Sequence, residues 1–168
     1  MNGTLDYYNS NAADYAKQTM TVDFSDTQDR FLEKLPAGAH ILDFGCGAGR
    51  DTKYFLEHGY IVTAVDGSPK LCKIASKHTG IQVRQMFFQD LNDAEAYDGI
   101  WACASVLHLP IDILNDVFSR MSTAVRTNGI LYVSFKYGCF EGERNNRWFT
   151  DFLKRNFSPF CKVFPNCL

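Results

Sequence analysis

The feature that most constrains this chain is a glycine-rich turn in the range 41–51. An apolar run ends at Phe44 and is followed by three glycines at alternate positions, Gly45, Gly47 and Gly49. A buried strand that turns sharply into a helix leaves the first N–H groups of that helix unpaired, and glycine lets a ligand approach the backbone closely. The turn therefore indicates a site for a polar ligand, with an ordinary glycine-rich connection as the alternative.

A second run, Ile61–Val65, is rich in β-branched residues and ends at Asp66, which lies 21 residues after Gly45. This distance suits a helix followed by a parallel neighbouring strand. An acidic residue at the carboxyl end of that strand can accept hydrogen bonds from both ribose hydroxyls of a nucleoside. Asp66 alone would be interpreted as the N-cap of the next helix, but together with the glycine turn it predicts nucleoside binding.

The details of the turn narrow the choice of nucleoside. Arg50 stands where the dinucleotide fingerprint has its third glycine, and the sequence has no phosphate loop of the G-x-x-x-x-G-K-[ST] type. The segment 42–49 (Leu-Asp-Phe-Gly-Cys-Gly-Ala-Gly) closely resembles the first motif of class I S-adenosylmethionine-dependent methyltransferases. The resemblance extends over residues 41–135, and the residues after the motif look most like the small tellurite-resistance type.

Strands and helices are predicted to alternate along the chain, which favours an α/β fold with a doubly wound, Rossmann-like, mostly parallel sheet. We expect one domain, with a helical cap at 1–38, a cofactor-binding core at 39–135 and a shortened C-terminal part at 136–168. The predicted strands are 41–44, 61–65, 81–88, 97–103 and 130–135, and the predicted helices are 5–18, 23–35, 51–58, 69–78 and one that starts at 111 and stops before 127–129.

The resemblance implies a cofactor site for S-adenosyl-L-methionine at the carboxyl edge of the sheet. Asp43 and the backbone of Gly45 and Gly47 would hold the methionine end, and Asp66 would hold the ribose. Asp90, together with the Gly67–Ser68 turn, would contact the adenine, although Asp90 could instead cap a turn. The other residues expected in this site are Cys46, Gly49, Leu91 and Ala104. Tyrosines of the segment 5–18 would close over the cofactor or simply pack on the flank of the domain.

The methyl acceptor is harder to predict. His108 follows the fourth strand and could deprotonate an acceptor, although a role in capping the next helix is favoured. The segment after that strand reads Ala-Ser-Val-Leu, unlike the motif of enzymes that methylate amino groups of nucleic acids, and it has no Pro-Cys pair. A small-molecule acceptor is therefore expected. Other polar candidates are Tyr7, Lys136, Tyr137 and Arg147, and an aromatic pocket would be formed by Phe44, Trp101, Tyr137 and Trp148.

Composition excludes several classes of protein. The net charge of −2 gives no electrostatic footprint for nucleic acid. The six cysteines are scattered singly, which fits neither a zinc site nor a disulfide framework. No apolar run approaches 18 residues and no leader pattern is present, so we expect a cytoplasmic protein with no membrane partner.

The C-terminal part departs from the family pattern. We expect a polar loop at 141–146 and a helix at 148–157, with only 161–164 left where the family continues into an antiparallel hairpin at the sheet edge. The hairpin would then be absent, or the sequence would be a truncated version of a longer protein. Its loss would expose the edge of the fifth strand and favour self-association through that edge.

Three functions follow from these interpretations. The first is transfer of a methyl group to a small molecule by in-line displacement. The second is a module that binds S-adenosylmethionine or S-adenosylhomocysteine without turnover because its tail is short. The third is a nicotinamide-dependent oxidoreductase, which Arg50 in place of the third fingerprint glycine disfavours.

Overall fold

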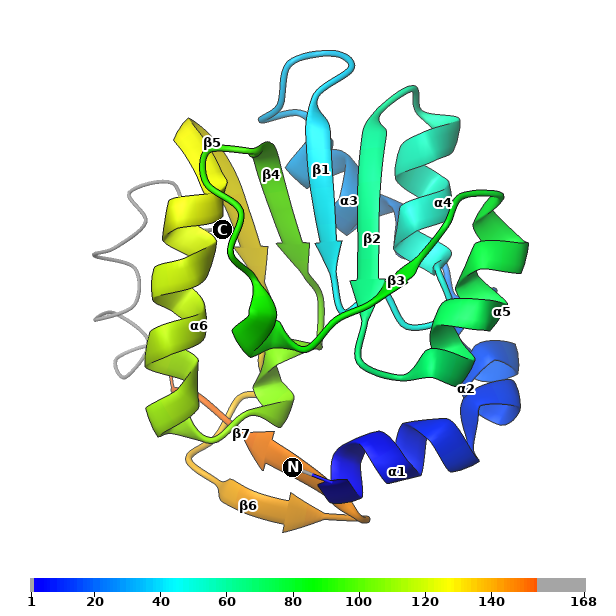
Figure 1. The fold of residues 1–168 in the computed structure, drawn as a ribbon, viewed down its shortest axis with the longest axis vertical. Helices are drawn as coiled ribbons and strands as arrows, with labels where there is room; N and C mark the ends of the chain where they lie inside the picture. Colours follow the sequence, from blue (N-terminus) through cyan, green and yellow to red (C-terminus); the bar gives the residue numbers. More distant parts are fainter. Residues whose placement is uncertain (1, 154–168) are drawn as a thin grey trace.

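A computed structural model describes residues 2–153 of the 168-residue chain. Its centre is a five-stranded parallel sheet with the strand order β3-β2-β1-β4-β5 (Figure 1). The strands are β1 His40–Phe44, β2 Ile61–Asp66, β3 Arg84–Gln85, β4 Tyr97–Ala102 and β5 Val125–Val133. The chain winds outward from β1 to β3 and then crosses to β4, so the strand order reverses between β1 and β4. The sequence prediction of a doubly wound, mostly parallel sheet is confirmed.

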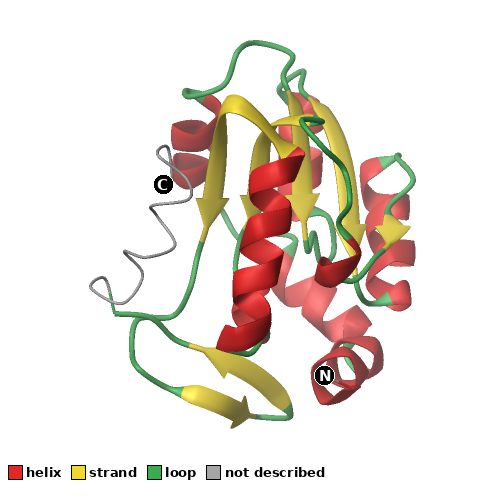
Figure 2. Ribbon diagram, turned by 60° about the vertical axis from the view of Figure 1, so that its left-hand side comes forward, coloured by secondary structure: helices red, strands yellow, loops and turns green. Residues whose placement is uncertain are grey.

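Helices cover both faces of this sheet, as expected for parallel strands joined by crossovers (Figure 2). Helix α6 packs on one face, and α3, α4 and α5 pack on the other. The helices are α1 Asn2–Ser10, α2 Ala12–Thr19, α3 Ser25–Leu32, α4 Arg50–Glu57, α5 Pro69–Thr79 and α6 Ile111–Ala124, with short 3-10 turns η1 Phe88–Asp90 and η2 Val106–His108. Helices α1 and α2 lie across the carboxyl ends of the strands, below the sheet in Figure 1.

The core has two sides because successive side chains of a strand point to opposite faces of the sheet. Leu42 and Ile100 are fully buried in the cluster that contains the apolar residues of α6. Their neighbours Ile41 and Trp101 are fully buried in the other cluster, together with Phe31 of α3 and residues of α4. Asp43 lies on the same side as Ile41, which directs its carboxylate toward α4 rather than toward α6.

Several element boundaries differ from the sequence prediction. The predicted helix 5–18 is two helices with a break at Asn11, and the predicted strand 81–88 is reduced to β3, Arg84–Gln85. Natural edge strands are often this short, and the apolar periodicity of residues 81–88 does not reveal that β3 is at the edge. Helix α6 ends at Ala124 because Val125 is already extended, so β5 begins before the predicted strand 130–135.

The C-terminal part contains a hairpin that the sequence analysis missed. Strands β6 Glu141–Arg144 and β7 Arg147–Thr150 pair in an antiparallel manner, so the predictions of a loop at 141–146 and a helix from 148 are wrong for these residues. Asn145 and Asn146 connect the strands with φ angles of 51° and 61°. Asparagine tolerates this left-handed conformation, which a two-residue type I′ hairpin turn requires. The rest of the predicted helix and the segment 161–164 lie outside the described residues.

This hairpin does not extend the main sheet. It forms a separate two-stranded sheet (orange in Figure 1), and β5 pairs only with β4 among residues 2–153. An isolated bridge between Tyr137 and Phe152 links the segments on either side of the hairpin. None of the helices in the described part of the chain has both the length and the apolar character needed to cross a membrane.

Candidate functional site

A cavity lies at the carboxyl edge of the sheet, beside the position where the strand order reverses. It contains about 720 Å³ of empty space, the open solvent at its mouth included. Residues that follow four strands line it, together with α1 and α2. The lining residues are Thr4, Leu5, Tyr8, Tyr15, Gly45, Gly47, Asp66, Gly67, Leu71, Met86, Phe87, Phe88, Gln89, Cys103, Ala104, Ser105, His108 and Leu109.

The glycine turn after β1 has a backbone that other residues adopt only with strain. Gly45, Gly47 and Gly49 have φ angles of 90°, 57° and 87°. A Cβ atom on Gly45 would lie 2.4 Å from Cβ of Ser105, and one on Gly47 would lie 3.2 Å from Cε1 of Tyr15. Glycine is therefore needed at Gly45 and Gly47 both for the conformation and for the close approach of neighbouring side chains.

Asp66 at the tip of β2 holds the glycine turn in place. One carboxylate oxygen accepts a hydrogen bond from the backbone N–H of Gly47 at 2.9 Å, and the other accepts one from the N–H of Ser68 at 2.8 Å. Burial raises the pKa of Asp66 to about 6, although these two hydrogen bonds oppose the increase. A carboxylate has about four lone-pair sites, so Asp66 retains acceptor capacity toward the cavity.

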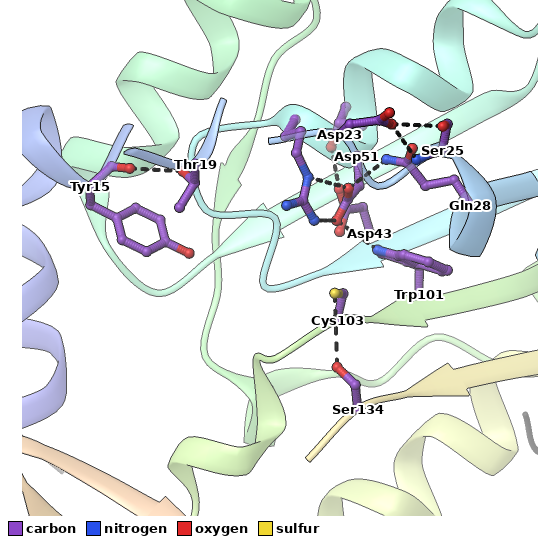
Figure 3. A network of polar contacts seen from close by, with 12 residues as sticks. Tyr15, Thr19, Asp23, Ser25, Gln28, Asp43, Asp51, Trp101, Cys103 and Ser134 are labelled. Carbon is purple, nitrogen blue, oxygen red and sulfur yellow. Dashed lines mark hydrogen bonds and ion pairs between the residues drawn. The ribbon is translucent and has the colours of Figure 1, made fainter. Parts of the chain in front are cut away.

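A buried polar network lies beneath the turn, on the α4 side of the sheet (Figure 3). Asp51 accepts hydrogen bonds from Nε2 of Gln28 at 2.6 Å and from Nε1 of Trp101 at 2.9 Å. Its immediate neighbour Arg50 donates both Nε and Nη2 to the same carboxylate, at 2.7 and 3.0 Å. Asp51 is only 8% exposed, so these donors replace the water that its charge has lost. The network fixes the first turn of α4 directly after the glycines.

Asp43 belongs to this buried layer rather than to the cavity wall. Its side chain is 2% exposed and accepts a hydrogen bond from Oγ1 of Thr52 on α4. Burial raises the pKa of the Asp43 carboxyl well above its usual range, and the nearby Asp51 charge raises it further. Asp43 therefore connects β1 to α4 in this structure.

The segment after β4 closes the cavity from the opposite side. Ala104 has a φ angle of 48°, which is unusual for a residue other than glycine. Oγ of Ser134 lies 2.7 Å from the Ala104 backbone N–H and accepts its hydrogen bond, and the buried Ser105 hydroxyl donates to the carbonyl oxygen of Phe44 at 2.6 Å. Such strain persists only where surrounding contacts enforce it, and it is concentrated at functional sites.

Helix α1 forms the roof of the cavity and contacts the start of α5, strand β7 and the turn η2. Oγ of Ser68, the N-cap of α5, donates to Oδ1 of Asn9 at 2.6 Å. Oγ1 of Thr4 accepts from the N–H of Trp148 in β7 at 2.9 Å. Between these contacts, the hydroxyl of Tyr8 lies 2.8 Å from Nε2 of His108. The N-terminal helices thus cover the strand tips.

His108 is buried and neutral. Its Nδ1 lies 2.6 Å from the carbonyl oxygen of Trp148, and the ring of Phe149 packs against it with centroids 4.7 Å apart. Burial lowers the pKa of His108 to about 4; the hydrogen bond to Trp148 opposes this decrease, whereas the positive charges of Arg147 and Lys136 add to it. The histidine is the last residue of η2 and links it to β7, but it does not cap α6, whose N-cap is Pro110.

The structure brings six of the twelve predicted site residues to the cavity. These are Gly45, Gly47, Asp66, Gly67, Ala104 and His108. The other six surround the cavity without lining it. Asp43 and Leu91 are buried, Ser68 caps α5, and Gly49 packs against α5. Cys46 lies within the glycine turn, with its thiol 3.8 Å from the Gly47 carbonyl oxygen, and Asp90 is an exposed residue whose carboxylate accepts from the N–H of Phe87 at 3.4 Å.

The aromatic residues of the cavity are not those that the sequence analysis proposed. Phe44 and Trp101 are fully buried in the core and Tyr137 is 79% exposed. Trp148 contacts residues of the site only through its backbone groups. The aromatic side chains that line the cavity are Tyr8, Tyr15, Phe87 and Phe88. The sequence analysis had proposed that tyrosines of the segment 5–18 lie near the cofactor. It missed Phe87 and Phe88 because both were predicted to lie in the strand 81–88.

Comparison with known proteins identifies the family. Residues 41–129, more than half of the chain, match the sequence model of a family described as a methyltransferase domain. The ubiquinone biosynthesis O-methyltransferase of Xanthomonas axonopodis pv. citri is 37% identical over 82 residues, which make up 45% of this chain and 34% of the relative. The similarity to this relative thus spans about a third of its length.

Two solved structures share the fold. The Burkholderia thailandensis 1,6-didemethyltoxoflavin-N1-methyltransferase, which holds 1,6-didemethyltoxoflavin and S-adenosylhomocysteine, superposes with a TM-score of 0.73 at 23% identity. That alignment covers 95% of this chain and 74% of the other. TehB from Haemophilus influenzae gives a TM-score of 0.72 at 19% identity, covering 94% of this chain and 54% of the other.

Proposed function

The chain belongs to the methyltransferase-domain family of class I S-adenosylmethionine-dependent methyltransferases, and from this we propose that it transfers the methyl group of S-adenosylmethionine to a small-molecule acceptor. The observation that carries the proposal is the pairing of the glycine turn with Asp66 at the edge of one cavity. The family assignment also removes the reason to consider a nicotinamide-dependent oxidoreductase.

The residues at the strand tips fit an adenosyl ligand. The Asp66 carboxylate lines the cavity and can accept from ribose hydroxyls, and Gly45 and Gly47 line the same cavity. Leu5 and Phe87, which lie beside Gly67, and Phe88, which lies beside Gly45, provide apolar surface suited to a planar base. We propose that Gln89, a cavity residue, contacts the base in place of the predicted Asp90, whose side chain is outside the cavity wall.

When bound, S-adenosylmethionine supplies a methyl group on a positively charged sulfur. The protein needs no nucleophile of its own for such chemistry. The task of its residues is to hold the acceptor in line with that methyl group and to exclude water, and positioning of this kind can contribute roughly 7–11 kcal/mol to catalysis. Helix α1 and the segment 103–109 are suited to this task, because residues of both line the cavity.

The names of the relatives support a small acceptor. The Xanthomonas protein is named for an O-methylation in ubiquinone biosynthesis, and the B. thailandensis protein holds a small heterocyclic molecule. A cavity lined on one side by α1 suits a small molecule better than a polymer.

The experiment is a two-stage measurement. Calorimetry with S-adenosylhomocysteine first establishes whether the cofactor binds, and incubation with methyl-labelled S-adenosylmethionine and a metabolite panel then tests transfer. Binding followed by transfer to any small molecule supports the proposal. Binding without transfer to any member of a broad panel would favour the alternative of a cofactor-binding module, and failure to bind the cofactor would contradict both.

A further inference from the structure

The two hydrogen bonds of His108, to Trp148 and to Tyr8, establish which atom donates and which accepts in each contact. A carbonyl oxygen can only accept, so the 2.6 Å contact with Trp148 requires the proton to be on Nδ1 of His108. The neutral ring then has an unprotonated Nε2, which must be the acceptor in the 2.8 Å contact with Tyr8. Tyr8 therefore donates its proton to His108, and its own oxygen still has lone pairs available.

Both members of this pair line the cavity. Tyr8 is on the roof helix and His108 is on η2, so their contact joins two elements that are 100 residues apart in sequence. Burial raises the pKa of Tyr8, and the Arg147 side chain, through a hydrogen bond to the phenol and through its charge, opposes that increase. A positive charge beside the phenol stabilises any negative charge that develops on its oxygen.

The lining of the cavity indicates the charge of the acceptor. Asp66 is the only acidic residue that lines it in the described part of the chain, and neither lysine nor arginine is among the lining residues. Arg147 does not line the cavity and reaches it only through its hydrogen bond to the Tyr8 phenol. An acceptor with a carboxylate or phosphate group would therefore lack a cationic partner of its own in the wall, which makes its burial costly. Leu109 and Tyr15 in the lining favour an apolar, planar molecule.

We propose that the Tyr8–His108 pair is a proton relay for an uncharged phenolic acceptor. This inference rests on the proposed methyltransferase function and names the acceptor class of the same site. Tyr8 is the catalytic residue that contacts the acceptor hydroxyl, and His108 acts through it as the final proton acceptor.

The relay accounts for the proton, the electron pair and the positive charge during methyl transfer. The acceptor hydroxyl donates its proton to the Tyr8 oxygen while the Tyr8 proton moves to Nε2 of His108. The acceptor oxygen forms a bond to the methyl carbon as the bond between carbon and sulfur breaks, and its electron pair stays on sulfur. The positive charge lost at sulfur appears on the imidazolium of His108, from which the proton returns to solvent.

The first test needs no acceptor. Nitrogen NMR of the imidazole in the cofactor-free protein at neutral pH should show His108 protonated at Nδ1 alone, with Nε2 accepting a hydrogen bond. In Tyr8→Phe the Nε2 resonance should shift toward that of a nitrogen without a hydrogen bond, whereas the matched variant Tyr7→Phe should leave it unchanged. A proton on Nε2 in the wild-type protein would overturn the relay.

The second test compares two probes, catechol and thiophenol. Catechol must lose a proton during transfer, whereas thiophenol is largely ionised at neutral pH and needs no relay. In Tyr8→Phe and His108→Gln, kcat for catechol should fall at least about a hundredfold while kcat for thiophenol stays within a few-fold of wild type. His108→Gln retains an oxygen that can accept from Tyr8, so it separates proton transfer from positioning. Equal losses with both probes, or no loss with catechol, would overturn the relay.

Failure of the relay can be distinguished from failure of the proposed function. If the wild-type protein does not bind S-adenosylhomocysteine, the proposed function is wrong. If it binds the cofactor and methylates neither probe, the phenolic acceptor class is wrong. Calorimetry should also give the same affinity for S-adenosylhomocysteine in Tyr8→Phe and Tyr7→Phe, which shows that the roof helix remains in place.

Discussion

The carboxylate of Asp66 accepts a hydrogen bond from the backbone N–H of Gly47 across 2.9 Å, so the tip of β2 and the turn after β1 are joined directly. The same side chain also holds the N–H of Ser68 at the start of α5. One side chain therefore fixes the glycine turn, the tip of β2 and the start of α5 relative to one another. Such preorganisation reduces the ordering that binding would otherwise require.

Asp66→Ala should weaken binding of S-adenosylhomocysteine at least about tenfold, because a hydrogen bond to a charged group contributes about 1.5–3 kcal/mol. Asp66→Asn, which retains one acceptor oxygen, should give an intermediate affinity. Calorimetry measures both, with the exposed Asp116→Ala as the control for a general loss of negative charge. Wild-type affinity in Asp66→Ala would show that this carboxylate does not contact the ligand.

Cofactor affinity should depend on pH through Asp66. Burial raises its pKa to about 6, and ribose hydroxyls donate best to the ionised carboxylate, so affinity for S-adenosylhomocysteine should decrease as the pH falls below about 6. The effect on folding has the opposite sign. A pKa above the ordinary value of 3.8 means that protonation of Asp66 favours the folded state, and this contribution is lost as pH rises through about 6. Asp66→Asn should remove the pH dependence of binding in this range, and an unchanged dependence would assign it to another group.

The turn should tolerate a methyl group at Gly45 much less than an ordinary loop does. Gly45→Ala and Gly59→Ala both place alanine at a positive φ, 90° and 82°, but only the first brings a Cβ atom to 2.4 Å from Ser105. The free energy of unfolding should therefore fall by about 1–3 kcal/mol more in Gly45→Ala, the usual cost of overpacking. Urea denaturation measures this difference, and equal losses in the two variants would mean that Ser105 moves aside without cost.

Asp51 should be one of the most sensitive positions for stability. Asp51→Ala would leave the buried donors of Gln28 and Trp101 without an acceptor and would also leave the Arg50 charge without its partner. We expect the free energy of unfolding to fall by about 3–5 kcal/mol. The exposed pair Asp116–Arg120 provides the matched control, because loss of such a surface ion pair costs no more than about 1 kcal/mol. Similar unfolding curves for Asp51→Ala and Asp116→Ala would show that the network is not stabilising.

Self-association through β5 remains a prediction. Among residues 2–153, β5 pairs on one side only and the hairpin β6–β7 does not cover its other side. An unpaired strand edge is a template for pairing with a second copy. Sedimentation velocity should therefore show association that increases with protein concentration, whereas a monomer at every concentration would mean that the edge is protected.

The sequence was most informative where structure is decided locally. The glycine turn and Asp66 were predictable because strand, turn and spacing are encoded within about twenty-five residues, and the helix-to-strand alternation was predictable from apolar periodicity. The hairpin β6–β7 was missed although Asn145–Asn146 is a recognisable two-residue turn, since the flanking strands are short and polar.

The remaining parts of the site depend on contacts between residues far apart in sequence. Nothing near His108 indicates that Tyr8, 100 residues earlier, supplies its hydrogen bond. Similarly, nothing in the sequence around Asp51 indicates that it accepts hydrogen bonds from Gln28 and Trp101, which lie 23 and 50 residues away. Such tertiary pairs leave no periodic or local pattern for a single sequence to show.

The most direct measurement is a crystal structure of the protein grown with S-adenosylhomocysteine. The ribose hydroxyls should lie within hydrogen-bond distance of the Asp66 carboxylate, and the amino-acid end of the ligand should rest against the backbone of Gly45 and Gly47. A ligand bound outside this cavity, or one whose ribose faces away from Asp66, would contradict the proposed cofactor site.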